Sequence, residues 1–459
     1  MMRPSRSESR EADTAALREE TMIRVFKEHP EFGEFTRFDT ATGRLAEITE
    51  GEFIRYLPEG FAIGSAAGGI QAIQGRGATV FVGEMPPTRT RFPRRVYFQI
   101  TRNCNLRCPT CFMRSGKGGA HVPTSAALAM ARFMGRNGLI EVRLTGGEPT
   151  THPAFFDVLH AFYDEGVYVS VATNGMVDYR TLDALAEEEN LWVICSVDGS
   201  RETHNLYRPG TFDLITGNMR YLKKRNPAIR LRLTTVLTKQ NKGQMHELGQ
   251  ICRSLGAESI TVIPLRPQVR DPAVLNDMVS AQEFRQVIED LVAMKQRLGV
   301  NVTTTLETDY AGAISRDPVF RKRSSCAAGR EGTNLDYDAG TGMFQMYGCS
   351  YSPASDLQAD PRIRKPFVAG QFPADVPATF LDIWRDERAW TIFRDLSLKS
   401  DDCSGCGYYA QQQCTGSCPI QNVDYSGIDA DGDVLAQLGE QIRHTTEWYC
   451  YKKVFGRRL

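Results

Sequence analysis

Cys104-Asn105-Leu106-Arg107-Cys108-Pro109-Thr110-Cys111-Phe112 is the stretch on which the interpretation of this chain depends. Its cysteines have the spacing C-x3-C-x2-C and follow the apolar run 96–100. An iron–sulfur cluster held by four protein thiolates carries electrons, whereas three thiolates leave one iron open to a small molecule. A zinc knuckle or three buried cysteines are the alternatives. Zinc sites usually add a second pair of ligands to C-x2-C, and the next candidate ligand, His121, comes alone.

The length and charge of the chain narrow its function class. At 459 residues it is long enough for two or three domains with a large core. Lysine plus arginine and aspartate plus glutamate balance at 55 each, so no charge excess favours a nucleic acid or a membrane as partner. No run of 18 apolar residues and no signal-peptide core occur, and residues 1–20 have the composition of a disordered start. We therefore expect a soluble cytoplasmic protein.

The twelve cysteines are distributed unevenly. In a reducing compartment they are unlikely disulfide partners, so metal ligation is the stronger interpretation. Cys195 and Cys252 are isolated and are expected to pack as small apolar residues. Seven cysteines follow Ser325 and include the spacing C-x2-C-x7-C-x3-C, which suits a metal or a cluster: Cys326, Cys349, Cys403, Cys406, Cys414, Cys418 and Cys450.

The order of predicted elements divides the chain into three parts. Residues 21–93 form a small module with a predicted hairpin over 35–49, which serves either packing or recognition of a substrate or peptide. Residues 94–310 alternate strands beginning near 96, 140, 167, 192, 229 and 259 with helices over 125–138, 154–166, 181–189, 212–224, 245–255 and 281–298. Thr124 is the predicted cap of the first helix, and Ser280 with Glu283 forms a capping box for the last.

Six βα units in series predict the α/β class, with a parallel sheet curled into a partial (β/α)6 TIM-like barrel. Residues 320–459 then form a loop-rich cysteine domain. Catalytic groups collect at the carboxyl ends of barrel strands, and each unusual motif of this chain falls there. The cysteine motif follows the first strand, Gly146-Gly147-Glu148-Pro149 the second, Thr173-Asn174 the third, and Ser196 with Asp198 the fourth.

The cysteine motif together with Gly146-Gly147-Glu148-Pro149 resembles the radical S-adenosylmethionine (radical SAM) superfamily over roughly residues 94–300. The resemblance implies a [4Fe-4S] cluster on Cys104, Cys108 and Cys111 whose open iron is chelated by SAM. In that family the cluster donates an electron and the S–C5′ bond breaks. The resulting 5′-deoxyadenosyl radical abstracts a hydrogen atom from the substrate. An electron donor such as flavodoxin or ferredoxin is the implied partner.

The same resemblance implies a set of SAM contacts. Glycines at the strand end let the backbone approach the methionyl part of SAM, and Glu148 accepts a hydrogen bond from its ammonium group. Thr173 and Ser196 are candidates for polar contacts, and Arg208 resembles the arginine that pairs with the SAM carboxylate. Phe112 lies where the family places backbone near the adenine. The implied set is Phe112, Gly146, Gly147, Glu148, Thr173, Ser196 and Arg208.

The seven late cysteines resemble the SPASM domain, an extension that carries auxiliary clusters. The family topology implies Cys326, Cys349 and Cys418 as ligands of a first auxiliary cluster. It implies Cys403, Cys406, Cys414 and Cys450 for a second. Two departures concern the loops: the third gap is x7 rather than x5, and Gly342 precedes Cys349 by seven residues rather than five. Structural zinc is the alternative for this region.

Two reaction hypotheses from different substrate classes follow. In the first, the enzyme modifies a ribosomal peptide or a protein side chain by crosslinking or oxidation, and auxiliary clusters accept an electron. In the second, it dehydrogenates, epimerises or rearranges a small molecule such as an amino acid or an aminosugar. A non-catalytic iron–sulfur scaffold gives no reason for Glu148 and Arg208 at the same rim as an open cluster. No catalytic acid or base is identified by sequence.

Overall fold

The computed structural model describes most of the chain. The described residues are 23–40, 42–61, 71–82, 87–189, 191–304, 326–395, 397–410, 418, 420–421, 423–445 and 449–455. The expectation for residues 1–20 and the proposed ligand Cys414 lie outside these ranges.

The described residues include a ten-stranded sheet with the order β12-β11-β10-β9-β8-β7-β6-β13-β14-β15. Its strands from β12 to β6 are parallel, which confirms the predicted partial barrel. They are β6 (Arg95–Thr101), β7 (Glu141–Gly146), β8 (Tyr168–Thr173), β9 (Leu191–Ser196), β10 (Arg230–Leu237), β11 (Ser259–Pro264) and β12 (Asn301–Thr304).

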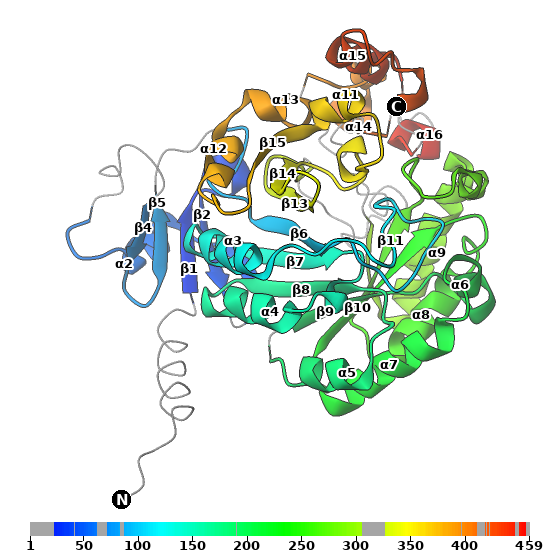
Figure 1. Ribbon diagram of the computed structural model, residues 1–459, viewed down its shortest axis with the longest axis horizontal. Helices are drawn as coiled ribbons and strands as arrows, with labels where there is room; N and C mark the ends of the chain where they lie inside the picture. Colours follow the sequence, from blue (N-terminus) through cyan, green and yellow to red (C-terminus); the bar gives the residue numbers. More distant parts are fainter. Residues whose placement is uncertain are drawn as a thin grey trace, which may run out of the picture.

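Helices cover the outer face of this sheet (Figure 1). They are α3 (Thr124–Arg136), α4 (Phe155–Asp164), α5 (Tyr179–Ala186), α6 (Arg201–Tyr207), α7 (Phe212–Arg225), α8 (Met245–Ser254) and α9 (Ala281–Leu298). The predicted capping box opens α9, with the Glu283 N–H donating to the Ser280 hydroxyl at 3.2 Å. The predicted cap of α3 is wrong: Thr124 is already the first helical residue, and Pro123 before it has no side-chain oxygen to offer.

The carboxyl-terminal region continues the same sheet. Its strands are β13 (Gly332–Asp338), β14 (Met343–Tyr347) and β15 (Val368–Pro373), and β13 pairs in parallel with β6. These strands were not expected in a region predicted to be loop-rich. The short helices of this region are α11 (Pro361–Arg364), α12 (Thr379–Arg385), α13 (Thr391–Arg394), α14 (Gly407–Ala410), α15 (Val434–His444) and α16 (Tyr451–Phe455).

The amino-terminal module is a five-stranded sheet within the described residues, in the order β3-β2-β1-β5-β4. Its elements are β1 (Ile23–Lys27), β2 (Phe35–Asp39), β3 (Arg44–Glu47), α2 (Glu50–Tyr56), β4 (Gln71–Gln74) and β5 (Thr79–Val82). The predicted hairpin is the antiparallel pair β2–β3. In Figure 1 the module lies at the amino-terminal ends of the barrel strands, opposite the rim that carries the cysteine motif.

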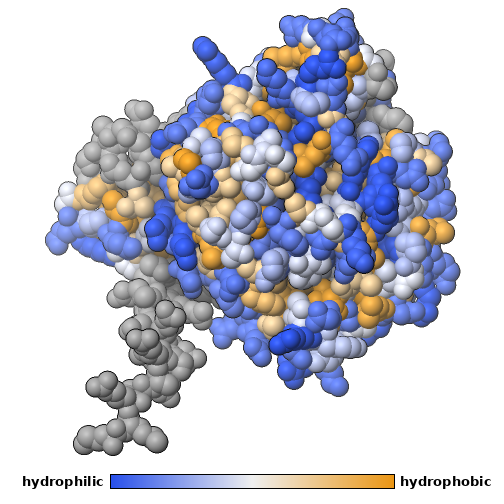
Figure 2. Space-filling view, viewed as in Figure 1, coloured by the Kyte–Doolittle hydropathy of each residue, from blue (hydrophilic) through white to orange (hydrophobic). Residues whose placement is uncertain are grey.

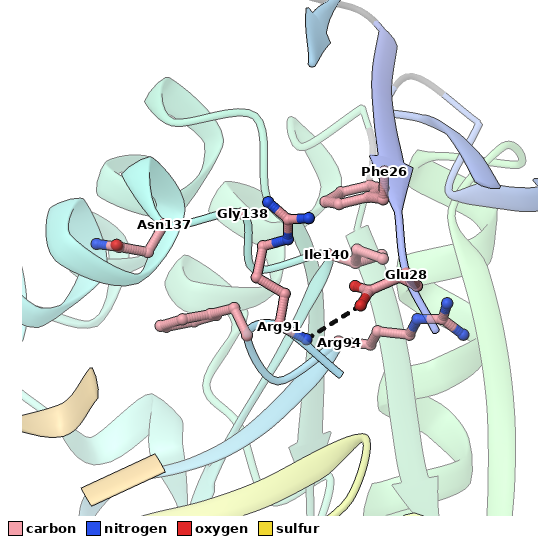
Figure 3. Close-up of a pocket in the computed structure, with 8 residues that line it drawn as sticks. Phe26, Glu28, Arg91, Arg94, Asn137, Gly138 and Ile140 are labelled. Atoms are coloured by element: carbon pink, nitrogen blue, oxygen red, sulfur yellow. Dashed lines mark hydrogen bonds between the residues drawn. The ribbon is translucent and has the colours of Figure 1, made fainter. Parts of the chain in front are cut away.

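Buried arginines and aromatic rings join the module to the barrel. Arg24 donates to the Leu139 carbonyl oxygen at 2.6 Å, and Arg94 donates to the Phe32 carbonyl oxygen at 2.6 Å. Within the module, the Arg91 N–H donates to the Glu28 carboxylate at 3.1 Å (Figure 3). The pocket drawn in Figure 3 has no room for a ligand. Apolar side chains of β1, β2 and β5 pack against Tyr168, the first residue of β8, and Trp192, the second residue of β9. The module therefore closes the end of the barrel at which the parallel strands begin.

Large apolar side chains are mostly inside. On the face in view in Figure 2, polar residues interrupt the apolar patches. The exposed large apolar side chains are scattered over different parts of the described chain: Ile54, Tyr179, Leu206, Leu214, Val376 and Leu435. Among the described residues, no helix has the length and apolar character needed to cross a membrane.

Candidate functional site

The cysteine motif lies in a loop that leaves the carboxyl end of β6 and folds back on itself. Isolated bridges join Thr101 to His121 and Asn103 to Gly116. The Cys104 N–H donates to the Gly116 carbonyl at 3.1 Å, and the Cys111 N–H donates to the Cys108 carbonyl at 3.3 Å. The loop thus turns its three cysteines together before α3 begins.

Two N–H groups lie close to the sulfur of Cys104. The Leu106 N–H lies 3.5 Å from Cys104 Sγ, and the Asn174 side-chain amide lies 3.7 Å from the same sulfur. The pKa of Cys104 is raised to about 11, chiefly by burial, with smaller contributions from Glu148, Cys108 and Cys111, while the Leu106 N–H opposes the rise. Donors aimed at a sulfur stabilise its thiolate, the form that binds metal. The residues therefore fit a thiolate-held metal cluster.

A single metal ion is a poorer match to this loop. In the described part of the chain, no group of three or more histidine, cysteine, aspartate or glutamate side chains converges as ligands of one ion. The sulfur ligands of a cubane cluster lie farther apart than those of a single ion, because each cysteine binds a different iron. The three cysteines share one loop, and Cys108 and Cys111 lie near enough to Cys104 to influence its pKa.

Gly146 and Gly147 are required by the cysteine loop itself. A Cβ at Gly147 would lie 2.1 Å from the Asn103 carbonyl oxygen, and one at Gly146 would lie 2.1 Å from the Thr101 carbonyl oxygen. The Gly147 and Glu148 N–H groups donate to these same two oxygens, each at 2.8 Å. Gly146 also has a φ of +134°, which disfavours a side chain. The glycines let β7 lie directly against the chain that enters the cysteine motif.

Glu148 is fully buried at the start of the turn η3 (Pro149–Thr151). Its Oε1 accepts from the Thr150 and Thr173 hydroxyls at 2.7 and 2.9 Å, and its Oε2 accepts from the Asn174 N–H at 2.7 Å. Burial raises the pKa of Glu148, and these hydrogen bonds oppose the rise. The predicted site residues Glu148 and Thr173 are thus brought into direct contact.

Arg208 lies beneath the same rim, at the end of α6. Its Nε donates to Asp198 Oδ2 at 2.7 Å, while Asp198 Oδ1 accepts from the Val236 N–H at 2.9 Å. Burial opposes the charge of Arg208, but Asp198 and Cys108 raise its pKa above the ordinary value. Among the described residues, neither its terminal nitrogens nor the half-buried Ser196 hydroxyl has a hydrogen-bond partner. These groups remain available to a ligand.

Phe112 connects the cysteine loop with the carboxyl-terminal region. Its ring lies 5.2 Å from that of Tyr351, centroid to centroid, and the Tyr351 N–H donates to Cys349 Sγ at 3.4 Å. The Arg266 guanidinium lies 5.3 Å from the Tyr351 ring centroid. Tyr351 therefore contacts both the residue that follows the cysteine motif and Cys349 of the carboxyl-terminal region.

The first implied set of auxiliary ligands gathers around two aromatic residues. Cys349 and Cys418 both pack on the apolar cluster that includes Tyr425, and both raise the pKa of that buried tyrosine in addition to its burial. Added Cβ atoms at Gly329 and Gly348 would both contact Phe393, so the chain after Cys326 lies beside the chain before Cys349.

Members of the second set also lie near one another. The Cys406 N–H donates to the Cys403 carbonyl at 3.2 Å, through a turn in which Gly405 has a φ of +73°. Cys450 lies just before α16, whose Lys452 forms an ion pair of 3.8 Å with Asp402. Cys414 is outside the described residues.

A groove of about 480 Å³ adjoins the cysteine loop. Its walls are residues 113–120, which follow the motif, and residues 337–340 and 356–358 of the carboxyl-terminal region, with Arg102 between them. Arg114, which has a φ of +53°, pairs with Asp356 at 3.2 Å across it. A volume of this size suits a small ligand or a short peptide segment.

Sequence reasoning missed several residues of this region. Asn174 and Asp198 were noted only as strand-end residues, although they hold Glu148 and Arg208 in place. Tyr351 and Arg102 were missed altogether. A polar residue directly after a barrel strand was the available signal for Asn174, whereas nothing local marks Tyr351, because its contact with Phe112 crosses more than 200 positions of the chain.

Comparison with known families adds an independent observation. Residues 98–251 match the model of the radical SAM superfamily. The match begins in β6 and ends in α8, so it contains the cysteine loop, Glu148, Thr173, Ser196 and Arg208.

Curated relatives cover most of the chain at low identity. The mycofactocin maturase MftC of Mycobacterium tuberculosis is 25% identical over 73% of this chain and 80% of its own length. The AdoMet-dependent heme synthase of Methanosarcina barkeri is 23% identical over 71% and 91%. The PqqA peptide cyclase of Rhodopseudomonas palustris is 22% identical over 77% and 90%.

Among solved structures, Streptococcus suis SuiB bound to the precursor peptide SuiA resembles this chain with a TM-score of 0.62. The likeness covers 87% of this chain and 94% of that one at 16% identity, so it bears on the fold. It extends beyond the barrel, since the barrel strands and their helices occupy only residues 95–304.

Proposed function

Residues 98–251 are a radical SAM domain, and from that premise we propose that this enzyme modifies a ribosomally made peptide or a protein side chain. When a [4Fe-4S] cluster and SAM are bound, reductive cleavage of SAM supplies the 5′-deoxyadenosyl radical that abstracts a substrate hydrogen atom. The residues described above hold and orient these groups, and the product is a crosslinked or oxidised residue.

The proposed cluster ligands are Cys104, Cys108 and Cys111. Donors from Leu106 and Asn174 hold the sulfur of Cys104 in a fixed direction. Gly146 and Gly147 keep β7 close enough to hydrogen-bond the entry to the loop. These contacts hold the loop against β7, and its three cysteines would hold the cluster at the rim where Glu148 and Arg208 lie.

For SAM, we propose contacts from the rim residues. Arg208 presents two terminal nitrogens to the carboxylate, while Asp198 fixes its Nε. The Ser196 hydroxyl is half-buried and available for a polar contact. Glu148 supplies negative charge near the ammonium, held by Thr173 and Asn174. The backbone next to Phe112 is the proposed neighbour of the adenine.

The carboxyl-terminal cysteines are the proposed ligands of auxiliary clusters that accept an electron. The first set is Cys326, Cys349 and Cys418, and the second is Cys403, Cys406, Cys414 and Cys450. Support comes from the shared surroundings of Cys349 and Cys418 and from the ion pair that links the turn at Cys403 to the helix after Cys450. An external one-electron donor such as flavodoxin or ferredoxin and the reducing cytoplasm are part of this proposal.

The groove beside the cysteine loop is the observation that favours a peptide over a small molecule as the substrate. It begins at residues 113–120, directly after the cysteine motif, and continues to residues 337–340 and 356–358 of the carboxyl-terminal region. Two relatives, a mycofactocin maturase and a PqqA peptide cyclase, are named for maturation and peptide cyclisation. The amino-terminal module is the proposed floor of the barrel, and its outer strands β3 and β4 offer edges for a peptide.

Anaerobic reconstitution with iron, sulfide and SAM, followed by mass spectrometry of added peptides, tests this function. Candidate peptides come from short open reading frames beside the gene. We expect a mass loss of about two hydrogens in a peptide, together with 5′-deoxyadenosine. Formation of 5′-deoxyadenosine with every neighbouring peptide left unmodified would contradict the peptide assignment.

The second candidate function is modification of a small molecule, and the heme synthase relative favours it. The same groove would then hold a compact substrate. Adding amino acids, aminosugars and carboxylated tetrapyrroles to the reconstituted enzyme separates the two: a product from one of these, with no modified peptide, would replace the first proposal by the second.

A further inference from the structure

The inner face of the barrel has a continuous polar register. Tyr97 pairs with Arg143, Arg143 with Ser170, Ser170 with Trp192, and Trp192 with Arg230 across neighbouring strands. Because side chains alternate along a strand, all five project away from the helices. The apolar residues between them, such as Val142 and Val193, belong to the core under the helices.

This inner face carries more cations than anions. Glu141 accepts from Arg95 at 2.7 Å and from Arg143 at 3.3 Å, and Glu258 pairs with Arg230 at 3.1 Å. The strands thus place two carboxylates against four guanidinium groups, those of Arg95, Arg143, Arg230 and Arg232. Arg95 and Arg230 are substantially exposed, so solvent screens their charges, whereas Arg143 and Arg232 are partly buried. A partly buried cation without a carboxylate is stabilised when an anion joins it.

Arg232 has no carboxylate partner in the described part of the chain. Its Nε donates to the Ser259 hydroxyl at 3.0 Å, and its guanidinium lies 4.2 Å from the Trp192 ring centroid. Its terminal nitrogens have no hydrogen-bond partner among these residues. Burial lowers the pKa of Arg232 to about 10, and the charge of Arg143 is the next cause. Arg232 and Arg143 are therefore two cations that share one interior.

The cationic interior opens toward the cysteine loop. Tyr351, whose ring contacts Phe112, lies close enough to Arg143 for the guanidinium charge to lower the pKa of its hydroxyl, although burial raises that pKa overall. Tyr97 and Arg232 are only half-buried although they lie inside the barrel. Both side chains therefore keep part of their surface open to a ligand.

We propose that Arg143 and Arg232 bind a carboxylate of the substrate inside the barrel, directly below the cysteine loop. The two terminal nitrogens of Arg232 can bind a carboxylate in two parallel hydrogen bonds. Arg143, which is already held by Ser170 and Glu141, adds its positive charge beside them. The inference rests on the peptide substrate proposed above and narrows it to a peptide whose reacting segment carries an acidic side chain or a free carboxyl end. The carboxylate would hold the peptide segment inside the barrel at Arg143 and Arg232. A carbon atom close to that carboxylate would then face the rim that carries the cysteine loop.

Matched peptides test the proposal with binding as the readout. The probes are two pools of fluorescein-labelled, carboxyl-amidated hexapeptides, identical except that one contains glutamate where the other contains glutamine. Fluorescence anisotropy with the reconstituted, SAM-loaded full chain measures both. We expect the glutamate pool to bind about tenfold more tightly, since one charge-assisted pair contributes on that order. A third pool with glutamine and a free carboxyl end tests the alternative source of the carboxylate.

Variants assign the effect to the interior. Arg232→Gln is expected to reduce the preference to within about twofold, and Arg232→Lys to retain part of it. The matched control is Arg220→Gln on the exposed face of α7, which should keep the full preference. A preference that survives in Arg232→Gln, or equal binding of all pools to the wild-type chain, overturns the proposal.

The wild-type comparison needs no variant, so a misfolded variant does not remove the test. Failure of the peptide function is distinguishable from failure of this inference. Peptides that are modified regardless of their carboxylates leave the proposed function intact and overturn the carboxylate site. Tighter binding of N-acetylglutamate than of N-acetylglutamine, with no peptide modified, supports the site and removes the peptide function.

Discussion

Glu148 shows what a single residue does in this account. It was predicted from its position after a glycine pair, and the structure places it fully buried at the rim. What sequence could not provide was its set of partners, because Thr173 and Asn174 come from another strand. Each of its oxygens accepts hydrogen bonds, so the side chain holds β7, η3 and the end of β8 together.

The first prediction concerns Glu148→Gln. The amide nitrogen of glutamine faces either the Asn174 N–H or the hydroxyls of Thr150 and Thr173, so one acceptor is lost inside the protein. We expect a loss of about 1–3 kcal/mol in unfolding free energy and weaker SAM binding, measured by chemical denaturation and calorimetry. The control Glu202→Gln, at an exposed position of α6, should stay within about 0.5 kcal/mol. Equal effects of the two variants would contradict the assigned role.

At the scale of elements, the barrel followed from the periodicity of the sequence. Strands and helices near 96–298 were predicted in order because their apolar residues repeat at the periods of buried strands and amphipathic helices. β13 was not predicted, because its buried positions Asn334 and Asp336 are polar. Asp336 is paired with Arg102, which lies beside the cysteine loop and more than 200 positions away along the chain. Such long-range pairing leaves no local signal.

Gly147→Ala tests the contact between two elements, β7 and the cysteine loop. Its Cβ would overlap the Asn103 carbonyl oxygen at 2.1 Å, so either strand or loop must shift. We expect a cost of about 1–3 kcal/mol and a lower iron content after reconstitution. The matched control is Gly217→Ala in the middle of α7, where a Cβ meets nothing within 4 Å and a small stabilisation is expected. Full iron incorporation by Gly147→Ala would count against the proposed loop geometry.

For the whole molecule, the amino-terminal module acts as the floor of the barrel. Arg24 is buried and donates to carbonyl groups of Leu139 and Glu165 on the barrel side. Arg24→Ala removes both bonds, and we expect a loss of about 2–3 kcal/mol and faster proteolysis between the module and β6. Arg37→Ala, which removes a half-exposed pair with Asp39 at 3.7 Å, should cost under about 1 kcal/mol. Unchanged proteolysis in Arg24→Ala would show that the module is held by other contacts.

The sequence could indicate a separate module at residues 21–93 but could not place it. Its attachment depends on Phe26, Phe38 and Phe81 packing on Tyr168 and Trp192, residues whose positions in sequence give no reason to pair them. In the same way, the spacing of the seven late cysteines predicted metal ligation but not which cysteines lie together. Cys349 and Cys418 both lie near Tyr425, and the Asp402–Lys452 ion pair links the turn at Cys403 to the helix after Cys450.

Removing one proposed auxiliary ligand tests this grouping on the whole chain. In Cys349→Ala, the N–H of Tyr351 loses its sulfur acceptor, and the proposed first auxiliary cluster would lose a ligand. We expect about four fewer irons per chain, with 5′-deoxyadenosine still formed from SAM. Cys252→Ala, a buried cysteine of α8 outside both sets, is the control and should keep its iron. Wild-type iron content in Cys349→Ala would contradict the assignment.

The central claim is that the loop of Cys104, Cys108 and Cys111 is the site of radical generation. The most direct measurement is 5′-deoxyadenosine formation by Cys108→Ala, reconstituted anaerobically and supplied with SAM and dithionite. The account predicts no product above background, with the iron of the carboxyl-terminal region retained at about eight per chain. Formation of 5′-deoxyadenosine at the wild-type rate by this variant would contradict it.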